Sequence, residues 1–195
     1  MDDAIQAIGL ISGGLDSILA LRLILDQGLV VEAMYVFLPV HDPQLRTWVE
    51  EVAGQSGVPL YVVTLEEEFF EVLRYPQYGY GSGMNPCIDC RILVLRQAAE
   101  RMHRVGADFV FTGEVLGERP MSQRRQAMDV VERESGLKGR LLRPLSAQLL
   151  PPTIPEEEGL VDRSRLLAIR GGPAACATCC PTGRPFPPTT SNCCG

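Results

Sequence analysis

The feature that most constrains the fold of this chain is a Ser-Gly-Gly turn between an apolar strand and an apolar helix. Residues 4–11 are typical of a buried strand, and residues 18–25 continue as a helical pattern. Between them, Gly13 and Gly14 permit positive φ, so that successive N–H groups point into one concavity. The positive end of the helix faces the same concavity. The turn therefore predicts a phosphate-binding site.

The side chains of the turn support the same interpretation. Ser12 and Ser17 supply hydroxyl donors, and Asp16 supplies a carboxylate that suits Mg²⁺ beside phosphates. No Lys follows the glycines, so the turn is not a Gly-x-x-x-x-Gly-Lys-Ser/Thr loop, and its spacing excludes Gly-x-Gly-x-x-Gly. An ordinary glycine turn capped by Ser and Asp is the alternative interpretation.

Further strands alternate with helices up to residue 112. The strand patterns cover residues 30–38, 59–65 and 108–112, and the helical patterns cover residues 16–27, 43–56, 66–73 and 87–105. Apolar strands separated by helices predict an α/β fold, a three-layer doubly wound parallel sheet covered by helices on both faces. Ligands bind such sheets at the carboxyl ends of the strands. Both the Ser-Gly-Gly turn and residues 112–114 are expected there.

The pattern weakens after residue 117. It predicts a helix over residues 120–134, a short strand over 141–145 and a last helix from 156 to 169. Residues 171–195 contain five of the seven cysteines and five prolines, with few residues that could build a core. We therefore expect an α/β domain over residues 1–170 and an irregular tail over residues 171–195.

Composition limits the classes of function. A net charge of −6 and a pI near 5.0 argue against binding nucleic acid by a bulk positive field, although a local basic patch remains compatible. No apolar run is long enough for a transmembrane helix. The sequence opens with Met-Asp-Asp rather than with the basic stretch of a secretory signal, so we expect a cytoplasmic protein.

A Cys-x-x-Cys pair, Cys87 and Cys90, stands at the start of a predicted helix. A helix N-terminus favours thiolates, which are better nucleophiles and better metal ligands than thiols. The interpretations that remain open are a persulfide or iron–sulfur site, a zinc half-site, a redox dithiol, and two small buried residues. The two histidines, His41 and His103, are too far apart in sequence to suggest a two-His metal site or a Ser-His-Asp triad.

Four blocks of sequence together resemble the PP-loop ATP pyrophosphatase superfamily. Within it, the chain is similar to tRNA 2-thiouridylases, 4-thiouridine synthetases and a subgroup of small thiouridylase-like proteins. The likeness extends over about residues 5–170. The blocks are Ser12-Gly-Gly-Leu-Asp-Ser17, Asn85-Pro-Cys-Ile-Asp-Cys90, Thr112-Gly-Glu-Val-Leu-Gly-Glu-Arg-Pro-Met-Ser-Gln123 and Pro144-Leu-Ser-Ala-Gln-Leu-Leu-Pro-Pro-Thr-Ile-Pro155.

The resemblance implies a two-step tRNA thiolation. ATP adenylates a uridine carbonyl oxygen with release of pyrophosphate, and a sulfur nucleophile then displaces AMP. It implies catalytic roles for Asp16, Cys87 and Cys90, with ATP as substrate and Mg²⁺ as cofactor. The ATP-binding residues that it implies are Leu10, Ile11, Ser12, Gly13, Gly14, Leu15, Asp16, Ser17, Val36 and Gly113.

The resemblance also implies partners and a metal site. Some relatives hold a [4Fe–4S] cluster with three cysteines, and Cys176 is the candidate third ligand beside Cys87 and Cys90, although its neighbours differ from the family's Gly-Gly-Cys-Leu-Leu type segment. The expected partners are tRNA and a sulfur donor, such as a cysteine desulfurase or sulfide, and a homodimer is a candidate assembly. Candidate contacts for ATP or RNA phosphates are Arg119, Arg124 and Arg125, with a solvated basic helix face as the alternative.

Two other functions fit the same residues. One is an ATP-dependent ligase or synthase acting on a small metabolite, with the cysteines holding structural zinc. The other is a nucleotide-binding subunit without catalysis, which docks on a partner. The larger tRNA thiolation enzymes contain additional RNA-binding domains, and we expect no such domain within these 195 residues.

Overall fold

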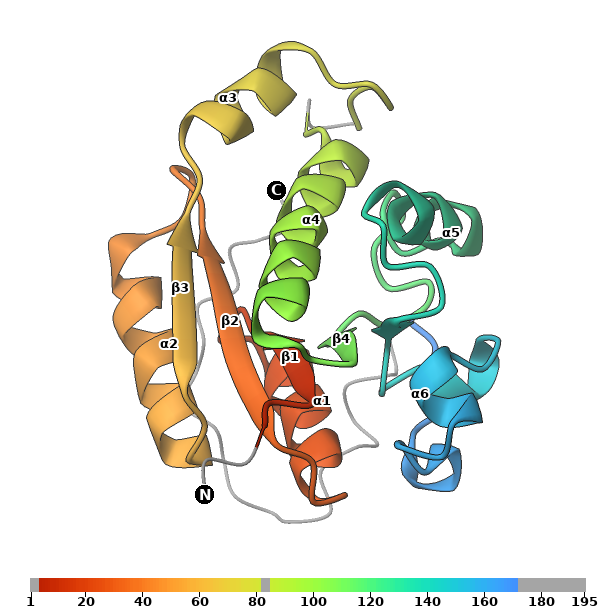
Figure 1. Cartoon of the computed structure of the whole chain (residues 1–195). Coiled ribbons are helices and arrows are strands. Elements are labelled where there is room, and N and C mark those ends of the chain that lie inside the picture. Colours follow the sequence, from red (N-terminus) through yellow and green to blue (C-terminus); the bar gives the residue numbers. More distant parts are fainter. Residues whose placement is uncertain (1–3, 82–84, 172–195) are drawn as a thin grey trace.

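A parallel five-stranded sheet with strand order β3-β2-β1-β4-β5 forms the centre of the molecule. The computed structural model describes residues 4–81 and 85–171 (Figure 1). The strands are β1 (Ala7–Leu10), β2 (Val31–Phe37), β3 (Leu60–Thr64), β4 (Phe109–Thr112) and β5 (Leu141–Leu142). Every pair of neighbouring strands is parallel, which confirms the predicted sheet.

Helices cover both faces of the sheet, as expected for a three-layer α/β fold. The longer helices are α1 (Leu15–Leu25), α2 (Pro43–Ser56), α3 (Glu67–Arg74), α4 (Cys87–Val105) and α5 (Arg125–Glu134). The fold ends with the short elements η1 (Ala147–Leu149), α6 (Ile154–Glu157) and η2 (Arg163–Arg165). None of the described helices is both long and apolar enough to cross a membrane.

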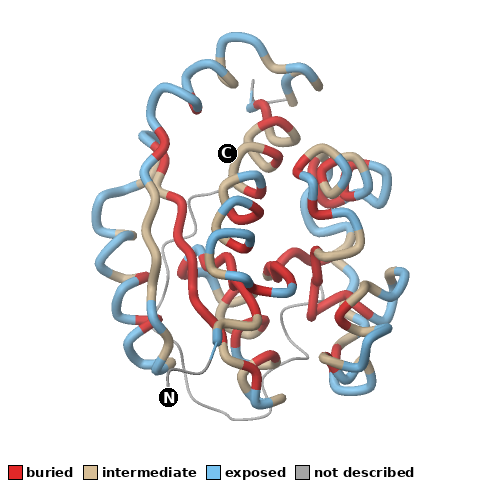
Figure 2. The backbone as a smooth tube through the Cα atoms, viewed as in Figure 1, coloured by how far each residue is buried: buried red, intermediate tan, exposed pale blue. Residues whose placement is uncertain are grey.

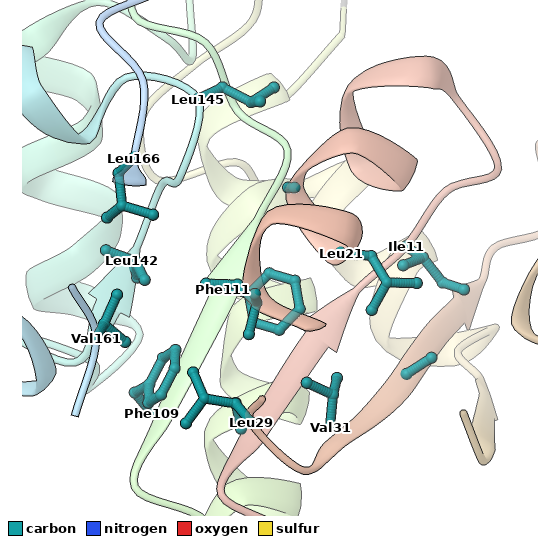
Figure 3. Packing of buried hydrophobic residues seen from close by; sticks show 14 of the residues in the cluster. Ile11, Leu21, Leu29, Val31, Phe109, Phe111, Leu142, Leu145, Val161 and Leu166 are labelled. Atoms are coloured by element: carbon teal, nitrogen blue, oxygen red, sulfur yellow. The ribbon is translucent and has the colours of Figure 1, made fainter. Parts of the chain in front are cut away.

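Two hydrophobic clusters hold the layers together. Between the sheet and α1 and α2, Leu21 and Val31 pack with Phe109 and Phe111, and Leu166 from the end of the described chain joins them (Figure 3). The second cluster joins the opposite face of the sheet to α3, α4 and α5. Figure 2 shows the result, with buried residues along the strands and exposed residues along the outer sides of α2 and α3.

Local signals in the sequence set the ends of two helices. The Asp42 side chain accepts the Gln44 N–H at 2.9 Å in front of α2, and Pro43 occupies its first turn. Gly57 after α2 and Gly106 after α4 adopt φ of 70° and 74°, which suits glycine. The predicted bounds 43–56 and 87–105 are confirmed.

Three predictions for the second half were wrong in extent. α5 begins at Arg125 rather than at residue 120, because residues 117–123 fold back on themselves through a Gly117 N–H bond of 2.8 Å to the Gln123 carbonyl. β5 contains two residues rather than five, because Pro144 has no N–H for a longer ladder. The helix predicted over 156–169 is instead the four-residue α6, ended by Gly159 with φ of 74°, and then η2.

The strand order fixes where a ligand can bind. From the central β1, the chain adds β2 and β3 on one side and then returns to add β4 and β5 on the other. Between the carboxyl ends of β1 and β4 lies the switch point at which α/β sheets bind ligands. Because α4 runs opposite to the strands, its first residue, Cys87, also lies at this carboxyl edge (Figure 1).

We expect the packing of β1 beside β4 to require glycine at position 9. Gly9 pairs with Phe111 across β1 and β4, and a Cβ on Gly9 would overlap the Phe111 ring. Gly9→Ala should lower the free energy of unfolding by about 1–3 kcal/mol through overpacking. Urea unfolding measures this free energy. The Gly9→Ala/Phe111→Leu double variant should lose less free energy of unfolding than the two single variants lose together. Additive losses would show that the ring does not oppose the new methyl group.

Candidate active site

The turn after β1 has a conformation that only glycine adopts easily. Gly13 has φ of 76°, and a Cβ on it would lie 2.6 Å from Cδ1 of Trp48. The indole Nε1 of Trp48 donates a hydrogen bond of 2.8 Å to the Gly13 carbonyl. Trp48, on α2, therefore stabilises the conformation of the turn by this hydrogen bond and by packing against Gly13.

The N-terminus of α1 has no side-chain cap. Its N-cap residue, Gly14, is extended with φ of −78° and ψ of 157°. The Ser17 hydroxyl donates to the Gly14 carbonyl at 2.8 Å and accepts the Ser12 N–H at 3.2 Å. The hydroxyl of Ser17 thus holds the turn together instead of standing free as a donor. The first N–H groups of α1 remain directed at the position where an anion would bind.

The residue after β4 packs directly on this turn. A Cβ on Gly113 would lie 2.5 Å from the Asp16 carbonyl carbon and 2.5 Å from the Ser17 nitrogen. The structure therefore brings Gly113 to residues 12–17, as the sequence suggested. Val36 lies near the carboxyl end of β2, where its side chain is buried against the α4 side of the sheet.

Three charged groups share one environment beside the turn. Burial raises the pKa of Asp16 above 3.8, while Arg119 acts in the opposite direction. Burial also raises the pKa of Glu118 above 4.5, and the negative charge of Asp16 raises it further against the effect of Arg119. Asp16 and Glu118 are therefore close enough to repel each other, and a cation between them would relieve this repulsion.

The three candidate arginines do not form one cluster in the structure. Arg119 lies beside Asp16, whereas Arg125 on α5 pairs with Asp129 at 3.1 Å. Arg125 also lines a cavity of about 80 Å³ between α5 and the proline-rich residues 150–153, away from the turn. Arg124, which is exposed, occupies the N-cap position of α5.

The Cys-x-x-Cys pair begins α4, as predicted, and both thiols are half-buried. Between them, the Asp89 carboxylate accepts the N–H groups of Gln77 at 2.8 Å and Tyr78 at 3.1 Å. Burial raises the pKa of the Cys90 thiol above 9.0, and the charges of Cys87 and Asp89 act in the same direction against Arg91. The expected stabilisation of a thiolate by the helix N-terminus is therefore outweighed at Cys90 by desolvation.

A buried ion network joins the cysteine helix to the end of β4. Nε of Arg91 lies 2.8 Å from one carboxylate oxygen of Glu114, and Nε of Arg143 lies 3.0 Å from the other. Arg143 also pairs with Glu132 at 2.9 Å, while its buried Nη2 lacks a hydrogen-bond partner among the described residues. Burial alone would raise the pKa of Glu114, but the two guanidiniums hold it below 4.5. Because Gly113 touches the turn and Arg91 follows Cys90, this network connects the two motifs.

The Pro-Leu-Ser block fixes the loop after β4 from the other side. The fully buried Ser146 hydroxyl accepts the Leu116 N–H at 2.9 Å and donates to the Ile169 carbonyl at 2.7 Å. Beyond it, the Gly171 N–H donates to the Leu116 carbonyl at 2.8 Å. The end of the described chain therefore lies beside Glu118, whose backbone a Cβ on Gly171 would overlap. Cys176 lies outside the described residues.

The comparisons with solved structures agree with this fold. The chain superimposes with a TM-score of 0.52 and 17% identity on a predicted subunit of tRNA methyltransferase from Methanocaldococcus jannaschii, covering 71% of this chain and 67% of that one. It superimposes with a TM-score of 0.51 and 16% identity on NMN synthetase from Francisella tularensis, covering 83% of this chain and 74% of that one.

The family model described as thiamine biosynthesis protein (ThiI) matches residues 4–148. The chain belongs to the ThiI family. This places it among PP-loop proteins, for which ATP and Mg²⁺ are implied.

Curated relatives of this ThiI family member are tRNA-specific 2-thiouridylases named MnmA. The protein from Sulfurimonas denitrificans is 31% identical over 116 residues, which cover 54% of this chain and 33% of the relative. The protein from Chloroflexus aurantiacus is 32% identical over 143 residues, which cover 64% and 40%. The chain thus spans about a third to two fifths of the length of these relatives.

The residues around the turn fit the implied Mg²⁺ better than the described thiols fit a cluster. Asp16 and Glu118 are oxygen donors with mutual repulsion, which suits a hard cation. Within residues 4–81 and 85–171, no group of three or more His, Cys, Asp or Glu is placed to hold a metal. The cysteines among the described residues, Cys87 and Cys90, would supply only two of the three thiols that such a cluster needs.

Sequence reasoning missed Trp48, Glu118 and the partners of Glu114. The contact of Trp48 with Gly13 joins residues 35 positions apart, and no local pattern in the sequence announces it. Glu114 and Glu118 had a detectable signal, since both follow the carboxyl end of β4. The ion pairs of Glu114 with Arg91 and Arg143 required the tertiary structure.

We expect Glu114→Gln to destabilise this ThiI family member by about 3–5 kcal/mol at neutral pH, because it leaves two guanidiniums without their shared counterion. Since folding lowers the pKa of Glu114, its contribution is complete above the unfolded-state pKa near 4.5 and is lost as pH falls through the folded-state pKa. The variant and the parent should therefore approach each other in stability as the pH falls below 4.5 and through the folded-state pKa of Glu114. Urea unfolding across this range measures the difference, and exposed Glu157→Gln is the control. A pH-independent difference would contradict the assigned ionisation.

Proposed function

We propose that this chain adenylates a uridine carbonyl in tRNA with ATP and then transfers sulfur to the activated carbon. One observation carries the proposal: the Ser-Gly-Gly turn and the Cys-x-x-Cys pair lie at the same edge of the sheet, joined by Gly113, Glu114 and Arg91. The MnmA relatives, which are named tRNA-specific 2-thiouridylases, support a tRNA substrate. They favour this function over a small-metabolite ligase with structural zinc.

The turn supplies the chemistry of the first step. A uridine carbonyl is a poor electrophile, so its oxygen must be converted into a leaving group before sulfur can displace it. N–H groups of residues 13–17 bind the triphosphate and stabilise the charge that develops on departing pyrophosphate. Arg119 is positioned to contribute positive charge at the same place. Mg²⁺, when bound by Asp16 with Glu118 nearby, neutralises phosphate charge.

The cysteine pair supplies the second step. A persulfide sulfur on one of the two cysteines attacks the adenylated carbon, and AMP leaves with the former carbonyl oxygen. The thiolate of the other cysteine then attacks the cysteinyl sulfur, which breaks the S–S bond, frees the thiolated uridine and leaves a Cys87–Cys90 disulfide for a thiol reductant to open. Burial raises the pKa of the Cys90 thiol and so disfavours its thiolate in the absence of a metal. If an iron–sulfur cluster is bound, Cys87 and Cys90 are two of its ligands and Cys176 is the candidate third.

The decisive experiment is a pyrophosphate-release assay with ATP and bulk tRNA, together with nucleoside mass spectrometry of tRNA from cells that lack the protein. Thiolated uridine should disappear from the mutant cells, and pyrophosphate should form only when tRNA is present. ATP binding without pyrophosphate release on any tRNA fraction would favour the non-catalytic nucleotide-binding subunit.

We expect Asp16→Ala to reduce tRNA-dependent pyrophosphate release by about a hundredfold or more, because phosphate charge is no longer compensated at the leaving group. The fold should survive, since Asp16 is only half-buried and makes no ion pair among the described residues. Exposed Asp26→Asn at the other end of α1 is the matched control and should retain the activity. Unchanged release in Asp16→Ala would remove this carboxylate from the mechanism.

Cys90→Ser should stop the insertion of sulfur while leaving pyrophosphate release intact, because the two steps use different groups. Mass spectrometry of the tRNA product measures the first quantity, and the phosphate assay measures the second on the same sample. The serine hydroxyl is close to the thiol in size, so a packing defect is not expected. Thiolation at the parental rate would exclude Cys90 from sulfur transfer.

A further inference from the structure

An acidic surface with exposed aromatic rings lies next to the cysteine pair. We define the acidic–aromatic surface as the outer side of α3 and the loop that follows it. Its members are Glu66, Glu67, Glu68, Phe70, Glu71, Tyr75 and Tyr80. Phe70, Tyr75 and Tyr80 are 46%, 78% and 45% exposed. Figures 1 and 2 show α3 at the carboxyl edge of the sheet, with exposed residues along its outer side.

The surface is fastened to the helix that bears the thiols. Phe69 is buried in the core below α3, so the exposed Phe70 on the next position faces outward. The Tyr80 hydroxyl donates to the Leu73 carbonyl at 2.6 Å, which folds the loop back onto the end of α3. The same loop is held by Asp89, which stands between Cys87 and Cys90. The loop end of the acidic–aromatic surface is therefore held at the start of α4, where both thiols are located.

The negative charge of the acidic–aromatic surface indicates which kind of molecule binds to it. Glu66, Glu67 and Glu68 are exposed without an ion pair among the described residues, and only Glu71 is paired, with Arg74 at 3.3 Å. Adjacent carboxylates repel the phosphates of RNA and attract Lys and Arg. Exposed aromatic rings beside them are typical of the anchors of protein interfaces. The chain's own residues 172–195 contain a single charged side chain, Arg184, and so match the surface poorly.

We infer that the acidic–aromatic surface is the docking site of a protein that has a basic contact surface and presents a cysteine persulfide to Cys87 and Cys90. This inference rests on the proposed function, since it names the partner that supplies its sulfur. In the transfer, a thiolate of the pair attacks the outer sulfur of the donor persulfide. The S–S bond of the donor breaks, a new S–S bond forms on this chain, and the donor leaves as a thiolate. No external oxidant or reductant is needed.

A matched pair of variants tests the surface. Glu67→Lys/Glu68→Lys changes two adjacent exposed glutamates on α3, and Glu50→Lys/Glu51→Lys makes the same change in net charge on the exposed side of α2. The probe is a purified cysteine desulfurase encoded in the same genome, loaded with ³⁵S from labelled cysteine. We expect the α3 variant to take up label about tenfold more slowly or worse, and the α2 variant to match the parent. Tyr75→Ser should slow the transfer without changing its dependence on salt.

Sodium sulfide separates the inference from the proposed function. Sulfide is small and needs no docking surface, so tRNA thiolation driven by sulfide should be equal in the parent and in both lysine variants. Absence of sulfide-driven thiolation in the parent would overturn the proposed function itself. Normal sulfide-driven thiolation with equal labelling of the two lysine variants would overturn the docking site alone.

Two further outcomes would assign the surface to another occupant. Loss of tRNA binding in the α3 variant, measured by filter binding, would make the surface an RNA site and overturn the inference. A parental dimer that dissociates only in the α3 variant, measured by sedimentation, would make it a contact between copies and overturn the inference as well. Circular dichroism of the two variants confirms that both are folded before the comparison is made.

Discussion

The close approach of Gly113 to the backbone of Asp16 and Ser17 is the contact on which the site depends. It is available only because residue 113 has no side chain, and it lies where the loops after β1 and β4 meet at the switch point of the sheet. Through Glu114 and Arg91 the same loop reaches the cysteine helix. One backbone contact and one ion network thus set the relative position of the Ser-Gly-Gly turn and a pair of thiols.

Burying the charges of this network costs free energy, which the close ion pairs among its members offset. Arg143 and Glu114 are both almost fully buried, and removing two charges from water is repaid only when each finds close partners. Glu114 receives a guanidinium on each oxygen, and Arg143 uses Nε and Nη1 on two carboxylates. An apolar cluster would hold β4 against α5 equally well. The ion pairs also fix the orientation of these two elements relative to each other, because each pair requires a particular geometry of its side chains.

The sequence predicted the fold and the two motifs because their signals are local. The strand patterns, Pro43 and Gly57 gave the α/β order and the bounds of α2, and the glycines marked the turn. The elements after residue 117 were harder to predict, since η1 and α6 are short and have no hydrophobic periodicity. Tertiary contacts help to hold them, such as those of the Ser146 hydroxyl in front of η1 and the bond from the Ile154 N–H of α6 to the Gly139 carbonyl. The roles of Trp48 and Glu114 depend on distant partners, which no window along the chain contains.

The parallel bridge between Leu116 and Arg170 has a practical consequence for handling the protein. It brings the chain, at Gly171, to the mouth of the switch point, while Ala7 begins β1 at the opposite edge of the sheet. A purification tag or fluorescent fusion joined shortly after Gly171 would therefore start beside the candidate site, whereas one joined in front of β1 would start at the opposite edge of the sheet. Fusions for activity measurements belong at the amino terminus.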